Sequence, residues 1–433
     1  NITMKKIKIV FLLIVMLGSS ILIAQQTPAS KQTKDFVILG GTAHIGNGEV
    51  IENSMIVVRN GKIDIIGEAD KTIVDKMAID IIDAKGKHVY PGFIIPNSTL
   101  GLVEVDAVKA SNDESEMGSM NPHIRSLIAY NAESKVVESM RPNGVLIGQI
   151  TPREGRVSGT SSVVQFDAWN WEDAVIKTDD GIHMNWPNSF SRGRWWQGED
   201  PGLKENKDYD KEVNELQDYF DESKAYANLM NQSTLNLPFK AMQGLFDDSK
   251  KLYINVDDEK GIIDAVNFSN SNNIKNIVIV GGHQAYKVAD LLKQNNVSVL
   301  LQRVHSVPSL EDEDYDLPYK MAKLLVDSGV LVALQTSGNM ERMNSRNLPF
   351  YAGTTVAHGL TKEQALQLIT LNAAKILGID ENYGSLSKGK SATLFMSEGD
   401  ALDMRTNLLT HAFIDGRLLS LETHQTELWK RYS

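Results

Sequence analysis

The sequence predicts an α/β protein in which a barrel stands beside a smaller β-domain built from both ends of the chain. Three observations support this prediction. Strands and helices alternate from about residue 250 onward, and short strands with tight turns fill both ends of the chain. An apolar strand that leaves the Pro91-Gly92 step ends in small polar residues. Alternating strands and helices produce parallel strands joined by helices.

The composition is that of an ordinary globular chain. Of the 433 residues, 42% are hydrophobic and 23% are charged, which excludes disordered and collagen-like classes. The formal net charge is −11, and no basic tract is long enough to indicate nucleic acid or anionic lipid as a partner. The chain has no cysteine, so disulfides and thiolate chemistry are excluded.

The N-terminal segment has the pattern of a secretory signal peptide. Lys5, Lys6 and Lys8 precede an apolar run at 9–23, and small residues follow near Ala24. We therefore predict a signal peptide over residues 1–24 and an exported protein, periplasmic or extracellular. An uncleaved N-terminal helix is the alternative. No other apolar run approaches the length of a membrane span, so we expect no further membrane contact.

Residues 31–90 are predicted to form short strands. The dipeptide Asn60-Gly61 separates the apolar runs 54–59 and 62–66, and it is the strongest short signal for a β-hairpin. A segment this small cannot bury a core of its own and needs a partner. Strands predicted near 394 and at 410–414 supply that partner. We therefore expect residues 31–90 and 380–433 to form one composite β-sandwich domain.

The barrel is assigned to residues 91–379. Its strands are predicted at 93–97, 145–150, 161–166, 252–256, 276–280, 297–301 and 330–334, and its helices at 121–138, 211–230, 261–270, 284–294, 317–328 and 361–377. About six of these strands are convincing where a (β/α)8 TIM-like barrel needs eight. The two missing strands must lie in the second quarter of the chain. The alternative to a regular barrel is a distorted one. No Gly-rich phosphate loop follows the first strand, which argues against a doubly wound nucleotide-binding sheet.

Two stretches resemble the amidohydrolase superfamily, specifically its imidazolonepropionase-like branch. Residues 91–99 read Pro-Gly-Phe-Ile-Ile-Pro-Asn-Ser-Thr, where that family reads Pro-Gly-Phe-Ile-Asp-x-His-x-His. Residues 370–378 resemble its Thr-x-Asn-x-Ala-x-x-Leu-Gly helix. Together with the order of the flanking strands, the resemblance covers most of the chain. It implies a barrel beside a split sandwich, hydrolysis of non-peptide carbon–nitrogen bonds, and a Zn cofactor bound at the strand ends.

The resemblance also implies where the metal ligands should stand, and most of them are replaced. Asn97 and Thr99 stand for the two histidines of strand one, and Asn255 for the histidine of strand five. Ser337 stands for the aspartate of strand eight, or Thr336 does if the register slips by one. No lysine can be placed on strand four. The pocket candidates at these strand ends are Asn97, Thr99, Asn255, His283, Arg303, His305 and Ser337.

These substitutions argue against a bound metal. Amide and hydroxyl groups bind Zn²⁺ poorly beside imidazole and carboxylate, and His283 is the one surviving ligand candidate. We therefore expect no cofactor, Zn being implied by the resemblance only, and we assign no catalytic residue. Two functions stay open. One is an amidohydrolase-type hydrolase, and the other is a non-catalytic relative that binds a small molecule or a catalytic paralogue.

Three local features have alternative interpretations. The five tryptophans between residues 169 and 196 either cover one wall of the core or line a ligand cleft. His283 and His305 either satisfy buried hydrogen bonds or contact a ligand. The acidic run at 311–316 is interpreted as a solvated face, with a loose Ca²⁺ site as the alternative.

Overall fold

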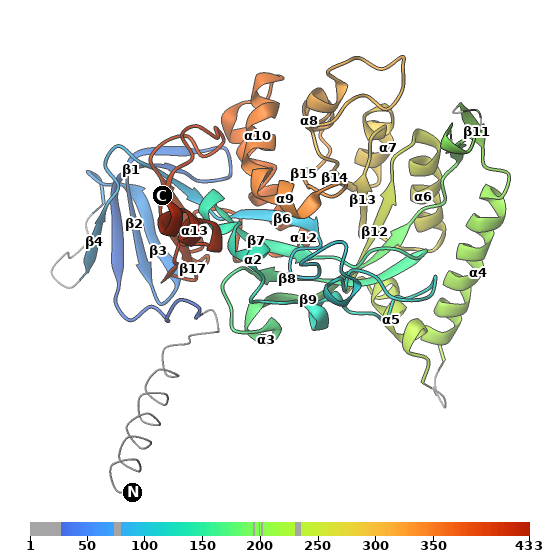
Figure 1. The fold of residues 1–433 in the computed structure, drawn as a ribbon, viewed down its shortest axis with the longest axis horizontal. Coiled ribbons are helices and arrows are strands. Elements are labelled where there is room, and N and C mark those ends of the chain that lie inside the picture. The colour runs from blue at the N-terminus through green and yellow to red at the C-terminus, as the bar shows by residue number, and fades with distance from the viewer. Residues whose placement is uncertain (1–26, 73–78, 194, 199, 201, 230–234) are drawn as a thin grey trace, which may run out of the picture.

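Two large sheets carry the fold (Figure 1). The computed structural model describes residues 27–433 except 73–78, 194, 199, 201 and 230–234. The predicted signal peptide at 1–24 lies outside the described residues. One sheet lies at the left of Figure 1, and the other runs through the centre to the helices at the right. Within the described ranges, no helix has the length and apolar character needed to cross a membrane.

The first sheet, which we call the terminal sheet, joins strands from both ends of the chain. Its eight strands are β1 (Phe36–His44), β2 (Val50–Arg59), β3 (Lys62–Glu68), β4 (Asp80–Asp83), β5 (His88–Pro91), β16 (Leu394–Ser397), β17 (Leu409–Ile414) and β18 (Arg417–Leu418). Their order is β18-β17-β16-β5-β1-β2-β3, and β4 pairs with β1. As predicted, Asn60 and Gly61 turn β2 into β3, and both have the positive φ that a type I′ turn requires.

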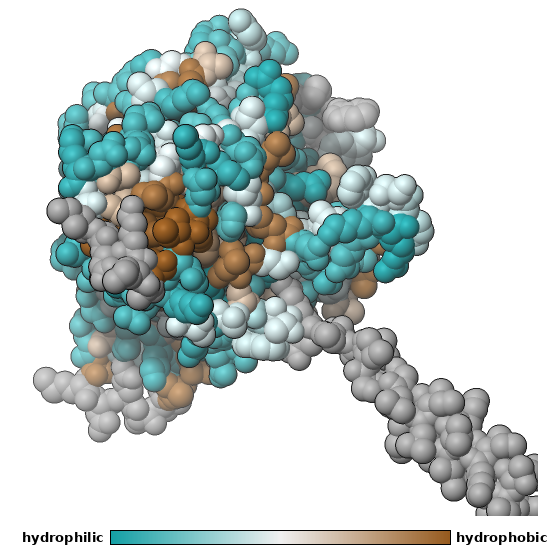
Figure 2. Space-filling view, turned by 90° about the vertical axis from the view of Figure 1, so that its left-hand side faces the viewer, coloured by the Kyte–Doolittle hydropathy of each residue, from teal (hydrophilic) through white to brown (hydrophobic). Residues whose placement is uncertain are grey.

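The terminal sheet curls over a core of its own. The rings of Phe36 in β1 and Phe413 in β17 stack with centroids 4.8 Å apart, although β5 and β16 lie between these strands in the sheet. The second face of the sheet buries Val37, Met55 and Val57. Figure 2 looks onto this end of the molecule and shows apolar side chains gathered within a hydrophilic surround. The predicted two-sheet sandwich and the domain limits stay predictions.

The second sheet is a nearly closed barrel with one reversed strand. Its strands are β6 (Phe93–Ser98), β7 (Val145–Ile150), β8 (Val157–Gln165), β9 (Val175–Asn185), β12 (Lys251–Val256), β13 (Ile277–Gly281), β14 (Ser298–Leu301) and β15 (Val332–Leu334). Neighbouring strands are parallel except that β8 is antiparallel to both β7 and β9. The N–H of Leu334 donates to the carbonyl of Leu368 at 3.1 Å, and the N–H of Ile94 donates to that of Ile369 at 2.8 Å. Residues 368–369 therefore bridge β15 and β6.

Most of the helices cover the outside of the barrel or close one end of it. The α-helices are α2 (Lys135–Glu138), α3 (Trp171–Ala174), α4 (Tyr209–Ala227), α5 (Leu237–Phe246), α6 (Glu259–Ser271), α7 (Ala289–Gln294), α8 (Leu317–Asp327), α9 (Glu341–Asn344), α10 (Leu348–Ala357), α11 (Lys362–Gln367), α12 (Leu371–Leu377) and α13 (His424–Tyr432). The C-terminal α13 lies beside the terminal sheet instead (Figure 1). The helix predicted at 361–377 is split into α11 and α12, because the backbone between them closes the barrel. A small hairpin of β10 (Phe190–Arg192) and β11 (Leu203–Glu205) follows β9.

The second quarter supplies the barrel strand missing from the predicted set, as part of an antiparallel meander. The sequence there forms the antiparallel strands β7, β8 and β9, and β9 was not predicted. Thr178, Asp179, Asp180 and Gly181 interrupt the apolar pattern of β9, and three of these four residues are of types depleted in strands. Of the helix predicted at 121–138, only α2 (Lys135–Glu138) is α-helical. The first half instead runs beside β8, where Arg125 bridges to Thr160.

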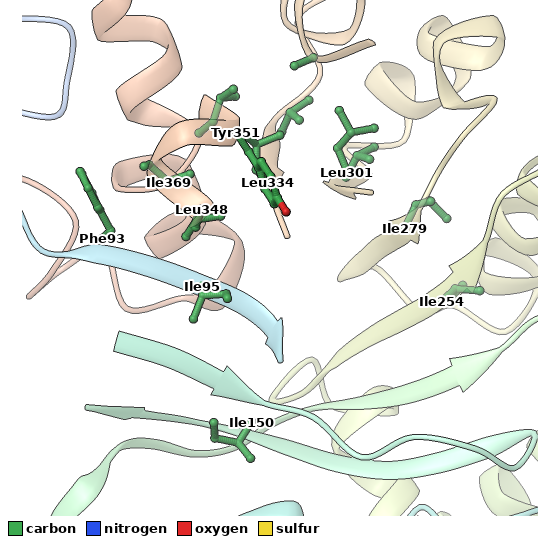
Figure 3. Packing of buried hydrophobic residues seen from close by; sticks show 14 of the residues in the cluster. Phe93, Ile95, Ile150, Ile254, Ile279, Leu301, Leu334, Leu348, Tyr351 and Ile369 are labelled. Carbon is green, nitrogen blue, oxygen red and sulfur yellow. The ribbon is translucent and has the colours of Figure 1, made fainter. Parts of the chain in front are cut away.

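Alternation along the barrel strands separates two cores. Side chains such as Ile95, Ile254, Ile279, Leu301 and Leu334 face the helices, where Leu348 and Tyr351 of α10 meet them (Figure 3). The alternate side chains Ile94, Ile147, Tyr253, Leu300 and Ala333 form an inner core that α12 closes at one end. Because the period of a strand is two, Gln149, Asn255, Gln302 and Gln335 follow on the same inner face toward the strand ends. The mouth of the barrel is therefore polar.

Two lysines anchor α12 beneath the barrel. The Nζ of Lys177 donates to the carbonyl of Leu377 at 3.0 Å, and the Nζ of Lys251 donates to the carbonyls of Lys375 and Ile376. These are the carbonyls that the last turn of a helix leaves unpaired. Burial, together with the charge of Lys177, lowers the pKa of Lys251 to about 8.

We expect alkaline pH to stabilise the protein relative to a Lys251→Met variant. Between about pH 8 and pH 10, the unfolded chain still holds the Lys251 proton, whose ordinary pKa is about 10.4, while the folded chain has lost it. Stability rises with pH where the unfolded state binds more protons, here by on the order of 2 kcal/mol. Urea unfolding of both proteins from about pH 7 to pH 10 measures this. A difference that stays constant with pH would contradict it.

Candidate functional site

An arginine fills the barrel mouth where β6 ends. One guanidinium nitrogen of Arg153 donates to the side-chain oxygen of Asn97 at 2.5 Å, and the other donates to the backbone carbonyl of Asn97 at 2.9 Å. The second nitrogen also lies 3.1 Å from Oε2 of Glu341, whose Oε1 accepts the N–H of Thr99 at 2.7 Å. Glu341 is only 5% exposed. A buried guanidinium–carboxylate pair therefore joins the two positions that stand for the histidines of strand one.

The end of β15 meets the same group of residues. The Oε1 of Gln335 accepts the N–H of Ser337 at 2.7 Å and lies 3.4 Å from the side-chain nitrogen of Asn97. We call Asn97, Thr99, Arg153, Gln335 and Glu341 the Arg153 cluster. The predicted candidates Asn97, Thr99 and Ser337 thus come together, as strand ends on one face of a barrel should.

The segment after β6 is tied down over the Arg153 cluster. Arg342 donates to the hydroxyl of Thr99 at 3.1 Å and forms ion pairs with Asp106 and Glu114. The backbone N–H of Arg153 donates to the carbonyl of Glu114. Through these contacts, the segment that contains Asp106 and Glu114 is held over the Arg153 cluster.

The residues of the Arg153 cluster do not fit a divalent metal. The side-chain oxygen of Asn97 already accepts from the guanidinium, which places a positive charge where a metal ligand would need to face a cation. Thr99 and Ser337 are hydroxyls, which are weak zinc ligands. Across the described ranges, no group of three or more His, Asp or Glu side chains is arranged to hold a metal ion. β9 is the fourth strand in the barrel order, and its Lys177 reaches α12 instead of the mouth.

A buried polar network lies in the barrel strands β7, β8, β9 and β12. Asp180 accepts hydrogen bonds from the hydroxyl of Tyr253 at 2.7 Å, the hydroxyl of Ser161 at 2.8 Å and the amide of Gln149 at 2.9 Å. Burial raises the pKa of Asp180 although these bonds oppose the shift. His183 stacks on Tyr253 with centroids 4.5 Å apart. Burial and then the charge of Arg153 lower the pKa of His183 well below its usual value, so the imidazole is neutral.

His283 has its own partners. Its Nε2 lies 2.9 Å from both carboxylate oxygens of Glu313, and its Nδ1 lies 2.5 Å from the side-chain nitrogen of Gln302. The side chains of His283 and Glu313 are 6% and 5% exposed. Both ring nitrogens are therefore satisfied. The interpretation of the whole acidic run at 311–316 as a solvated face is wrong for Glu313, because that carboxylate turns inward to His283.

A cavity of about 610 Å³ opens beside His283, over the ends of β12, β13 and β14. Asp257 and Gln302 line it from the barrel, and Phe190 and Leu203 of the β10–β11 hairpin line it from outside. We call it the mouth cavity. None of the tryptophans whose side chains are described lines it. Trp186 is buried and donates to the hydroxyl of Tyr209, as a core residue does.

Among the described residues, no hydrogen bond or ion pair joins the remaining candidates to the Arg153 cluster or to His283. The side-chain nitrogen of Asn255 lies 3.5 Å from the carbonyl of Met184, and Arg303 donates to the carbonyl of Asn339 at 3.0 Å. His305 is exposed, and its Nε2 lies 2.7 Å from the hydroxyl of Thr354 in α10. In the part of the chain that the structure describes, no hydrogen bond or ion pair joins His283 to Asn97.

Sequence reasoning missed Arg153, Glu341, Asp180 and His183. Arg153 lies in an irregular segment and Glu341 begins the one-turn helix α9, and in neither place does a single charge carry a pattern. For Asp180 and His183 the sequence offers only a weak signal of a polar site, namely two titratable residues close to the apolar Ile182.

Comparisons with known proteins agree with the barrel fold. The sequence profile of the amidohydrolase family matches residues 318–419. An imidazolonepropionase of Flavobacterium psychrophilum is 30% identical over 110 residues, which are 24% of this chain and 27% of that protein. An adenine deaminase of Clostridium botulinum is 21% identical over 401 residues, which are 89% of this chain and 57% of that protein. The chain thus spans only part of the curated relatives that it matches.

A solved structure extends the likeness to nearly the whole chain. The amidohydrolase from Thermotoga maritima MSB8 superimposes with a TM-score of 0.72 over 89% of this chain and 99% of that one, at 22% identity, which shows a shared fold. The chain is thus similar to amidohydrolases in sequence over residues 318–419 and in fold over most of its length.

Proposed function

We propose that this chain is a non-catalytic member of the amidohydrolase superfamily that binds a small molecule at the barrel mouth. The observation that carries the proposal is the position of Arg153, which pairs with Glu341 and donates to Asn97. A cation supplied by the chain itself stands among the residues that would have to bind a metal. Metal-activated water, the nucleophile in this kind of hydrolysis, has no donor set to form on.

The mouth cavity supports the binding part of the proposal. Its volume of about 610 Å³ is in the range of small-molecule pockets, and it lies at the strand ends where barrels of this kind hold ligands. Export through a signal peptide at 1–24 and association with a catalytic paralogue remain parts of the same proposal, supported by the sequence pattern alone.

A hydrolase that acts on carbon–nitrogen bonds is the second candidate function. The similarity to the imidazolonepropionase and adenine deaminase sequences favours it. Its difficulty is chemical. His283 holds Glu313 and Gln302 with its two ring nitrogens and would have to release one of them to accept a proton.

Elemental analysis of the purified chain tests the choice between the two functions. We expect well below one zinc, iron, cobalt or manganese per chain, and no loss of adenine or imidazolonepropionate when either is incubated with the protein. About one metal per chain, the stoichiometry of a catalytic site with three protein ligands, would overturn the non-catalytic proposal. Turnover that a chelator abolishes would do the same.

Two variants test the role of Arg153. The first carries Asn97→His, Thr99→His, Asn255→His and Ser337→Asp, which restore the ligand types of the family. The second adds Arg153→Ala, which removes the competing cation. We expect the four changes to raise zinc binding more when Arg153→Ala is added to them. If the four changes alone restore one zinc per chain, Arg153 is not what excludes the metal.

A further inference from the structure

The mouth cavity carries more negative than positive side chains. Asp257, Asp258, Glu259 and Asp264 line it, against Arg192 and Lys260. Three of the carboxylates have partners within the fold. Asp258 accepts from the hydroxyl of Ser189 at 2.6 Å and the N–H of Gly261 at 2.9 Å, Asp264 pairs with Lys260 at 2.6 Å, and Glu259 lies 4.0 Å from Lys287.

Asp257 is the exception. No ion pair joins it to any described residue, and the hydrogen bond that its Oδ1 accepts from the N–H of His283 is long, at 3.3 Å. Its side chain is exposed where it lines the cavity. A carboxylate in this position gains from a cation that enters the cavity, because an opposite charge a few ångströms away favours the ionised form.

The mouth cavity also has an apolar lining. Phe190 and Leu203 of the β10–β11 hairpin are 48% and 52% exposed, and Ile263 and Leu310 line the cavity with them. Arg192 on the same hairpin is occupied, since it donates to the carbonyl of Ser309 and so ties the hairpin to the loop after β14. The cavity therefore offers both carboxylates and apolar side chains to a ligand.

We propose that the mouth cavity binds a small organic cation, a protonated amine joined to an apolar group. The ammonium pairs with Asp257, and the apolar group packs against Phe190, Leu203 and Leu310. This inference rests on the proposed small-molecule function and names the chemical class of its ligand. A neutral ligand leaves Asp257 unpaired, and a carboxylate ligand is repelled by the excess of acidic side chains.

Calorimetric titration with three probes of similar size tests the inference. The probes are 4-phenylbutylamine, 4-phenylbutan-1-ol and 4-phenylbutyrate, which share a phenylalkyl group and end in a cationic, a neutral and an anionic group. We expect the amine to bind at least about tenfold more tightly than the alcohol, and the butyrate to bind most weakly, since hydrogen bonds to charged groups contribute more than neutral ones. Equal affinity for all three, stronger binding of the butyrate, or no binding of the amine would overturn the inference.

Two variants locate the effect. Asp257→Asn keeps the shape of the side chain, and we expect it to weaken amine binding by about 10- to 100-fold while changing alcohol binding by less than about threefold. Asp218→Asn on the exposed face of α4 makes the same change of charge outside the cavity and should leave both affinities unchanged. Amine binding that survives Asp257→Asn, or that falls equally in Asp218→Asn, would contradict the assignment.

A cavity-filling variant separates this inference from the proposed function. Leu310→Trp should weaken the binding of amine and alcohol alike, because it occupies space along the apolar lining. If 4-phenylbutyrate binds and Leu310→Trp removes that binding, the cavity is a small-molecule site and only the cation class is wrong. The metal analysis and turnover assays decide the non-catalytic proposal independently of all three probes.

Discussion

Arg153→Met is expected to lower the free energy of unfolding by about 3–5 kcal/mol, the range seen when one partner of a buried ion pair is removed. Methionine fills much of the volume of the arginine stem, so the loss is mainly electrostatic. Glu341 would remain buried at the barrel mouth with no cation, and the side-chain oxygen of Asn97 would lose the hydrogen bond from the guanidinium. Urea unfolding at neutral pH measures the change from the shift in midpoint at constant slope.

A double-mutant cycle distinguishes a broken ion pair from a cavity. Glu341→Gln removes the negative charge and keeps the shape of the side chain. Added to Arg153→Met, it should recover about 1–3 kcal/mol relative to the sum of the single changes, the usual size of coupling between contacting residues. Strictly additive effects would show that Arg153 and Glu341 do not act as a pair.

The second large effect is expected at Asp167, which fastens the start of the described chain to the barrel. Asp167 is 2% exposed and forms ion pairs with Arg141 at 3.3 Å and Arg417 at 3.1 Å. It also accepts the N–H of Ala29 at 2.9 Å. Arg141 is itself buried, and burial lowers its pKa although Asp167 opposes the shift. Removing the one carboxylate would leave two buried or half-buried guanidinium groups facing each other.

Asp167→Asn should therefore cost about 3–5 kcal/mol in the free energy of unfolding. Amide hydrogen exchange at Ala29 should also become faster. The matched control is Asp327→Asn on the surface of α8, where Asp327 pairs with Lys323. This exposed pair should contribute less than about 1 kcal/mol. Equal losses in the two variants would show that burial of Asp167 does not determine its effect.

The parts of the fold that sequence could predict are those with local signals. β12, β13, β14 and β15 are short runs rich in Val, Ile and Leu between polar segments, and the structure places them within two residues of the predicted bounds. β9 could not be found this way. Its Asp180 is acceptable inside a strand because Gln149, Ser161 and Tyr253 come from other strands to bond it. These three partners of Asp180 are distant in sequence, so the residues around β9 do not reveal them.

The candidate residues also divide into those with a local sequence signal and those that depend on contacts between distant segments. Asn97, Thr99 and Ser337 could be predicted to meet because each lies at the end of a parallel strand. Arg153 and Glu341 stand 188 positions apart and pair only in the folded chain. The substitutions at the strand ends predict that the metal ligands are replaced, but the guanidinium that meets Asn97 and Glu341 could be identified only from the contacts of Arg153 in the folded chain.

The reversed strand β8 bears on the order in which the chain folds. Loop closure is slow for strands that are distant in sequence, and parallel strands need long connections. β7, β8 and β9 follow one another directly and pair as antiparallel neighbours, so this meander can form from a short stretch of chain. The terminal sheet is the opposite case, since β5 pairs with β16 across some 300 residues. Assembly can therefore begin at the meander, whereas the terminal sheet has to wait for the end of the chain.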